Sequence, residues 1–432
     1  MVFPKFYPKQ RREPRFWTDL LIVAAALMDW LPSYVQATLS GGVESEIIVS
    51  GSKLLILPLL CIDFFKSKAY WLGNVRIPLI AVGILFLLFL PYVFHPSYAP
   101  FARLSPYIFN VFLLMYFSHS RSFDRCKLLM LFSVFCASAV PFSQVLVQVG
   151  ILQPLQEHKA AGESVERVFA VTRTATIGVF SAYCLAFFGG LVCVQHMRRW
   201  YLFLPISLVI VAASLATPLF TSQRTVAIVG GLAPLGGFVV FARARAVAAL
   251  FLGIAAVLIG PLILALLSPD LIDRWYYLMQ RFAGVDLGGG FGTESSAYFR
   301  YQEVMTVLER MIPFPEVIGP GVVAYTSVTG IAPHTFIGAI YYDGGVILLL
   351  LYIGFITYLG VSHFRLYFML RDPVRRALVG AYLVYFCAFI LNSLVMPVMG
   401  DRVMPFTLGL GVSLLAACRS SSMHGHRLMH RR

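Results

Sequence analysis

Arginines and one histidine are the side chains of this sequence best suited to chemistry on an anionic substrate. Arg224 is the clearest case, because it lies in the four-residue polar break TSQR between two apolar runs. A guanidinium group carries a planar fork of donors that fits a phosphate and keeps its charge at any physiological pH. We therefore interpret Arg224 as an anion clamp. The alternative is a structural arginine that caps backbone carbonyls or extends along apolar surface to reach water.

Two further arginines are candidates for the same anion. Arg300 lies in the segment TESSAYFRYQEVMTVLER, residues 293–310, where a surface salt bridge with Glu303 or Glu294 would also explain it. Arg173 opens an apolar run and could instead be an anchor at a membrane interface. The sequence leaves both alternatives open.

A histidine at the junction of a polar loop and an apolar run is the candidate for proton chemistry. His334 follows Pro333 in the stretch GIAPHTFIGAIYYDGGVILLLLYIGF, residues 330–355. An imidazole with its ordinary pKa of about 6.5 can take a proton from a hydroxyl, or orient that hydroxyl, near neutral pH. The alternative is an interfacial histidine that hydrogen-bonds a backbone carbonyl.

Composition indicates that membrane helices position these residues. The chain has 432 residues, of which 59% are hydrophobic and 12% charged, whereas soluble domains carry about 25% charged residues. Apolar runs of roughly 18 residues or more recur along the chain, and each can cross a bilayer as a helix. We predict an all-α polytopic membrane protein with about twelve transmembrane helices, at residues 18–38, 47–65, 77–94, 104–119, 128–150, 173–195, 201–219, 225–242, 247–267, 336–361, 378–397 and 404–418.

The distribution of charge predicts the topology. A net charge of +14 would suggest a nucleic-acid partner in a soluble protein, but here alternate loops and the N-terminal segment hold 23 of the 34 Lys and Arg residues. Basic loops stay on the cytoplasmic side, so both termini are predicted to be cytoplasmic and no nucleic acid is expected as a partner.

This topology divides the chain into four parts. We expect transmembrane helices 1–9 in residues 1–267, a loop domain outside the cytoplasm at 268–335, helices 10–12 at 336–418, and a basic cytoplasmic tail at 419–432. Residues 293–310 read as an amphipathic helix that would lie over the outer membrane face like a lid, with Arg300 and Glu303 together on one face. Its apolar face is predicted to consist of Ala297, Tyr301, Val304, Met305 and Leu308.

Three motifs, in this order, resemble the bacterial superfamily of O-antigen ligases and O-antigen or exopolysaccharide polymerases. They are the short break TSQRTVAIVGG, the arginine-bearing helix SSAYFRYQEVMTVL, and a Gly-x-Gly followed by a histidine that enters a helix with a glycine pair. The motifs span roughly residues 215–360. The chain departs from the family pattern at Thr335, where Asn is common. It keeps Gly319, Gly321, His334, Asp343 and Gly344.

The resemblance implies a glycosyltransferase of the bacterial inner membrane with a periplasmic active site. The donor would be a glycan on undecaprenyl diphosphate, and the acceptor a sugar hydroxyl of lipid A core (ligase) or of a second lipid-linked glycan (polymerase). Arg224, Arg300 and Arg173 would bind the diphosphate, while His334 would activate or orient the hydroxyl and the anomeric centre would invert. The exterior loops hold no Asp-x-Asp pair, so arginines would replace a metal, and we expect neither metal nor cofactor.

A transporter that flips the same lipid-linked glycans is the alternative function. Twelve helices and a basic cytoplasmic face suit it equally well. Transporters, however, place charged residues near the midplane in broken helices, whereas the arginines and His334 are predicted to gather at one interface.

Overall fold

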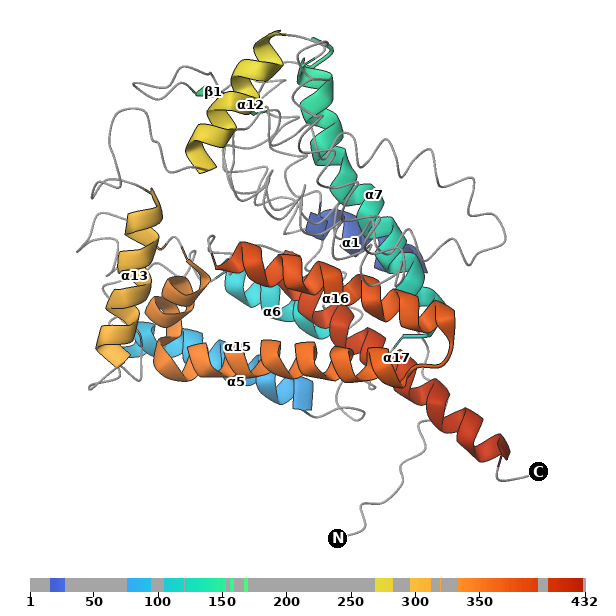
Figure 1. The fold of residues 1–432 in the computed structure, drawn as a ribbon. Helices are drawn as coiled ribbons and strands as arrows, with labels where there is room; N and C mark the ends of the chain where they lie inside the picture. The colour runs from blue at the N-terminus through green and yellow to red at the C-terminus, as the bar shows by residue number, and fades with distance from the viewer. Residues whose placement is uncertain are drawn as a thin grey trace.

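The described part of the protein is predominantly helical. The computed structural model describes residues 16–27, 76–94, 105–119, 121–148, 150–152, 156–158, 167–169, 269–282, 296–311, 319, 333, 335–394 and 403–429. Within these ranges lie nine helices and one two-stranded sheet (Figure 1). The predicted helical fold class is therefore confirmed for these residues.

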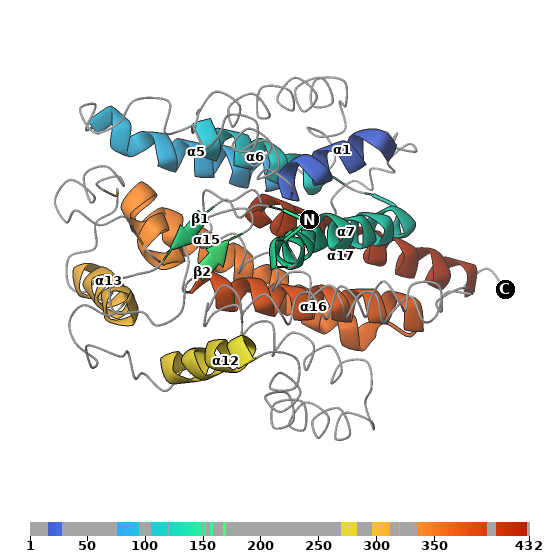
Figure 2. The same ribbon diagram turned by 90° about the horizontal axis from the view of Figure 1, so that it is seen from above.

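Five helices run side by side as a bundle (Figures 1 and 2). They are α5 (Arg76–Phe94), α6 (Ser105–Phe117), α15 (Phe336–Met369), α16 (Pro373–Ser393) and α17 (Val403–Met429). Two further helices, α1 (Phe16–Leu27) and α7 (Phe123–Gln148), pack on each other and on α17. Among the described helices, α15 and α16 are long and apolar enough to cross a membrane.

Several helix bounds agree with the sequence prediction. Helices α5 and α6 begin and end within two residues of the predicted spans 77–94 and 104–119, and α15 begins at the predicted residue. Helix α17 continues to Met429, so most of the segment predicted as a tail is helical; its polar continuation contains no proline to stop it. The predicted spans 47–65, 173–195, 201–219, 225–242 and 247–267 lie outside the described residues.

The capping residues of α16 explain why this helix begins earlier than the predicted residue 378. Asp372 is the N-cap, and its carboxylate accepts a hydrogen bond from the Val374 amide at 3.0 Å. Pro373 occupies the first helical position, where its missing N–H costs nothing and its fixed φ suits a helix. These two residues start the helix at 373 although the apolar run begins only at 377.

Aromatic side chains fill the centre of the bundle and tie α16 to α17. The Tyr382 hydroxyl donates to the Thr407 carbonyl at 2.9 Å, and the hydroxyls of Tyr385 and Thr407 are hydrogen-bonded to each other. Phe117 of α6 meets Phe406 of α17 edge to face, with ring centroids 5.0 Å apart. The hydroxyl groups of Tyr382 and Tyr385 on α16 therefore find partners on the neighbouring helix α17.

Basic loops gather at the end of the bundle where α15 finishes. The Arg375 guanidinium lies 5.5 Å from the centre of the Phe123 ring, which joins the start of α16 to the start of α7. At the same end, Arg121 forms a buried ion pair with Asp19 of α1 at 2.9 Å. These loops therefore lie at the opposite end of α15 from its start (Figure 1).

Two helices belong to the segment predicted as the exterior loop domain, namely α12 (Pro269–Phe282) and α13 (Ser296–Met311). Helix α13 lies across the end of the bundle where α15 begins (Figures 1 and 2). The predicted helix at 293–310 is confirmed over residues 296–310. Two residues of its predicted apolar face are exposed, Tyr301 at 61% and Leu308 at 45%, while Glu303 and Val307 are buried. Helix α13 contacts the start of α15 through Glu303, so its apolar face does not point toward α15.

A short antiparallel hairpin is the one departure from helix among the described residues. Strand β1 (Gln156–His158) pairs with β2 (Arg167–Phe169), with Glu157 opposite Val168. It falls in the loop predicted between the spans 128–150 and 173–195, so the all-α prediction missed a small β element outside the bundle.

Candidate functional site at the start of helix α15

The residue that follows His334 is the N-cap of α15. Thr335 has extended backbone angles, φ −117° and ψ 153°, and its hydroxyl oxygen accepts a hydrogen bond from the Gly338 amide at 3.0 Å. A threonine side chain in this position satisfies one of the amides that a helix leaves unpaired at its first turn. Thr335 therefore has a structural role at the start of α15.

A carboxylate from α13 completes this cap. Glu303 Oε1 accepts from the Thr335 hydroxyl at 2.7 Å and from the Thr335 amide at 3.1 Å. Glu303 is only 4% exposed and Thr335 1%. The negative charge also lies at the positive end of the α15 dipole, which favours it further.

The arrangement is a capping box divided between two helices. In an ordinary capping box the third helical residue is Glu or Gln, and its side chain returns to the N-cap amide. Here that third residue is Gly338, and a Cβ built on it would collide with the carboxylate of Glu303. The absent side chain leaves the space that the carboxylate of α13 occupies, so glycine at 338 and glutamate at 303 depend on each other.

Helix α15 bends sharply nine residues after its start. Gly345 has φ 72° and ψ −168°, a combination that only glycine adopts without strain. The rings of Phe336 and Tyr352 lie 6.0 Å apart, edge to face, although sixteen residues of straight helix would separate them by about 24 Å. The first segment of α15 is therefore folded toward the second, and Figure 1 shows it beside α13, at an angle to the rest.

The bend brings together three of the residues predicted to support the site. A Cβ on Gly319 would lie 2.5 Å from the carbonyl oxygens of Tyr341 and Tyr342 and 2.8 Å from the Gly345 nitrogen. Gly319 is thus a point of direct backbone contact with the bend. Asp343 and Gly344 immediately precede Gly345, and Asp343 is 3% exposed.

The remaining predicted site residues are only partly described. Arg300 belongs to α13, one helical turn before Glu303, but its side chain is not described. His334, Arg224, Arg173 and Gly321 lie outside the described residues. His334 is flanked by two buried described residues, Pro333 and Thr335.

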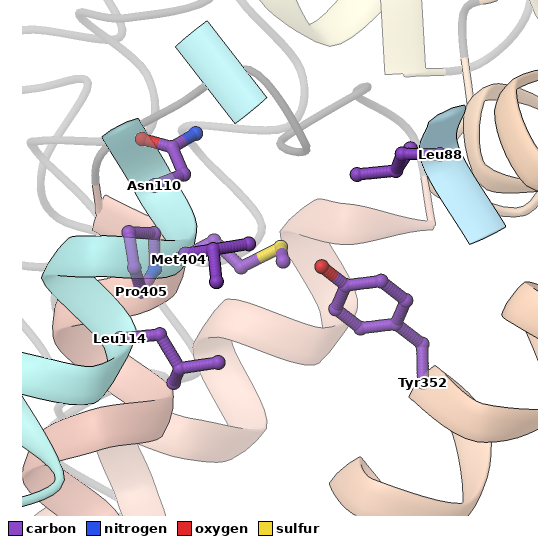
Figure 3. A pocket seen from close by; sticks show the side chains of 7 residues that line it. Leu88, Asn110, Leu114, Tyr352, Met404 and Pro405 are labelled. Carbon is purple, nitrogen blue, oxygen red and sulfur yellow. The ribbon is translucent and has the colours of Figure 1, made fainter. Parts of the chain in front are cut away.

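A small pocket lies further along the bundle and is too small to be a sugar site. It has room for about one water molecule. Side chains from α5, α6, α15 and α17 surround it, and the Tyr352 hydroxyl and the Asn110 amide are its polar groups (Figure 3). Its lining residues are Leu88, Asn110, Val111, Leu114, Tyr352, Met404 and Pro405.

Sequence reasoning missed the function of Glu303, which it treated as a partner for Arg300. The available signal was an incomplete capping box, Thr335-x-x-Gly338, at the start of a long apolar run. A glycine in the third helical position leaves room there for a carboxylate from another element.

No protein-family model matches the chain, and no curated protein matches its sequence. The resemblance to O-antigen ligases and polymerases therefore depends on the motif residues alone.

Proposed function

We propose that the protein is a glycosyltransferase of the bacterial inner membrane that moves a glycan from undecaprenyl diphosphate to a sugar hydroxyl. The acceptor is lipid A core, as in an O-antigen ligase, or another lipid-linked glycan, as in a polysaccharide polymerase. The reaction is inverting and needs no metal or cofactor.

The observation that carries the proposal is the hydrogen-bonded contact between α13 and the start of α15. The resemblance gives Arg300 and His334 complementary tasks, although they are far apart along the loop. Glu303, one turn after Arg300, accepts two hydrogen bonds from Thr335, the residue that follows His334. The contact supports a site shared by the arginine-bearing helix and the histidine-bearing segment.

In the proposed reaction, the acceptor oxygen attacks the anomeric carbon from the face opposite the diphosphate. The new carbon–oxygen bond forms as the bond between the anomeric carbon and the phosphate oxygen breaks. His334 takes the hydroxyl proton or orients the hydroxyl, and undecaprenyl diphosphate leaves. Arg224, Arg300 and Arg173 stabilise the charge that develops on the leaving group. Gly319, Gly321, Asp343 and Gly344 support the backbone around the histidine.

The proposed topology places this site at the periplasmic surface of a twelve-helix protein with both termini in the cytoplasm. Two observations support it. The basic loops near Arg121 and Arg375 gather at the end of α15 opposite to α13. Residues 346–369, beyond the bend, form about 36 Å of helix, enough to cross a hydrocarbon core of about 30 Å. A polyprenyl diphosphate in the outer leaflet would meet α13 at headgroup level.

The proposal is tested with purified protein in liposomes that contain an undecaprenyl-diphosphate-linked glycan and one acceptor at a time. We expect a new glycosidic bond of inverted configuration, together with release of undecaprenyl diphosphate. A product of retained configuration would contradict the mechanism, and absence of product with both acceptors would contradict the function. Deletion of the gene distinguishes a ligase from a polymerase. If the deletion strain still carries single glycan repeats on lipid A core, the protein is the polymerase.

One observation favours the flippase alternative. Helix α15 is bent at Gly345, and the buried Asp343 lies within its apolar part. Broken helices and buried ionisable groups are typical of transporters. The same liposomes discriminate the two functions, since a flippase would move the glycan across the bilayer without forming a bond.

A further inference from the structure

The divided capping box links the position of α13 to the order of the segment before α15. The Thr335 amide and hydroxyl are buried, and Glu303 accepts from both of them. If α13 moves away, both donors lose this acceptor, and the N-cap of α15 loses its carboxylate partner. The start of α15 is therefore complete only while α13 is docked.

A cap alone would not require this arrangement. A glutamate at position 338 would cap α15 from within its own helix. The chain instead has Gly338, which leaves space for the carboxylate of a different helix. Val307, one turn further along α13, is fully buried and adds an apolar contact to the docked helix. The cap thus makes the start of α15 depend on α13, whose Glu303 lies 32 residues before Thr335 in the chain.

We infer that Glu303 is a positioning residue of the transferase site: through Thr335, the residue that follows His334, it fixes the start of α15 relative to the Arg300 turn of α13. This inference rests on the proposed function. Glu303 does not touch the reacting atoms in this mechanism. It holds the group that binds the leaving diphosphate and the group that handles the acceptor proton in one geometry. A displacement of about 1 Å between such groups can cost about 100-fold in rate.

Four variants separate positioning from simple capping. Glu303→Ala removes the link, and Glu303→Gln keeps an oxygen that can accept both bonds. Glu309→Ala is the matched control, because Glu309 is exposed on the same helix. The double variant Glu303→Ala with Gly338→Glu moves the carboxylate into α15, which restores the cap without restoring the link to α13.

The turnover rate and amide hydrogen exchange of the segment around Thr335 and Gly338 are measured for each variant in the liposomes. We expect Glu303→Ala to lose about 100-fold in kcat with little change in KM, and Glu303→Gln and Glu309→Ala to stay near the wild-type rate. The double variant should regain amide protection but not turnover. Wild-type turnover in Glu303→Ala overturns the inference, as does full recovery of turnover in the double variant.

These measurements also test the positioning role of Glu303 separately from the proposed glycosyltransferase function. A wild-type protein that forms no glycosidic bond overturns both. An active wild type with an inactive His334→Ala variant and a fully active Glu303→Ala variant overturns only the positioning role. If Glu303→Ala does not insert, Glu303→Gln and the double variant, each of which retains a cap, decide the question.

Discussion

Replacement of Asp19 by alanine should destabilise the protein strongly. The Asp19 carboxylate is completely buried and accepts hydrogen bonds from the Tyr116 hydroxyl at 2.8 Å and from Arg121 Nη2 at 2.9 Å. Arg125 Nε lies 3.6 Å from its second oxygen. Arg121, itself 3% exposed, donates in addition to three carbonyls at the end of α6, those of Tyr116, Phe117 and His119.

The magnitude follows from the burial of both partners. Removal of one member of a buried, hydrogen-bonded ion pair costs about 3–5 kcal/mol, because the other charge stays buried without its counter-charge. Asp19→Asn should lose less, since its amide oxygen can still accept from Tyr116. The control is Asp124→Ala: this carboxylate is 83% exposed and pairs with Lys127 three residues away at 3.0 Å. Such a surface pair contributes about 0.5 kcal/mol or less.

Unfolding by SDS in mixed micelles, followed by tryptophan fluorescence, measures these differences in the free energy of unfolding. The expected order of loss is Asp19→Ala, then Asp19→Asn, then Asp124→Ala. If Asp19→Ala and Asp124→Ala lost the same free energy, the buried network would not be what joins α1 to the end of α6, and the reasoning would fail.

Two further predictions concern the bend and the proposed chemistry. Gly345→Ala should cost about 1–3 kcal/mol, because the bend needs backbone angles that alanine rarely adopts, and it should abolish transfer by moving the start of α15. Gly354→Ala, in open space on the same helix, should cost nothing in the same SDS titration, and equal effects of the two would refute the role of the bend. Transfer should continue unchanged in EDTA, and a loss that Mg²⁺ or Mn²⁺ restores would refute the arginine-based mechanism.

Helix positions could be predicted from the sequence because they depend on local properties. Apolar runs of sufficient length placed α5, α6 and the start of α15 within two residues of the structure. The first and last residues of a helix were less predictable where capping residues, and not the apolar run, determine them. Asp372 and Pro373 start α16 before its apolar run, and α17 continues into polar sequence.

The face on which a helix packs could not be predicted in the same way. The sequence predicted the apolar face of α13 that contains Tyr301 and Leu308, but the helix docks through Glu303 and leaves both of these side chains exposed. A polar group that satisfies buried donors on another element outweighs a few partly exposed apolar side chains. That preference depends on a partner 32 residues away, Thr335, so no window of local sequence contains it.

The bend in α15 could not be predicted either, because it involves a contact with a residue outside the helix. The pair Gly344–Gly345 lies in an apolar run that hydropathy reads as one continuous span. Gly345 has a positive φ, and Gly319 lies directly against the backbone of this bend; the sequence showed Gly319 only as part of a motif. The motif residues were identified, but not the backbone contact that they make.

The most direct test of the central claim is the rate of glycosidic bond formation by the His334→Ala variant in liposomes with a lipid-linked glycan donor. The account predicts that the wild type forms the bond and that the variant, correctly inserted and folded, does not. A His334→Ala protein that transfers glycan at the wild-type rate would contradict it.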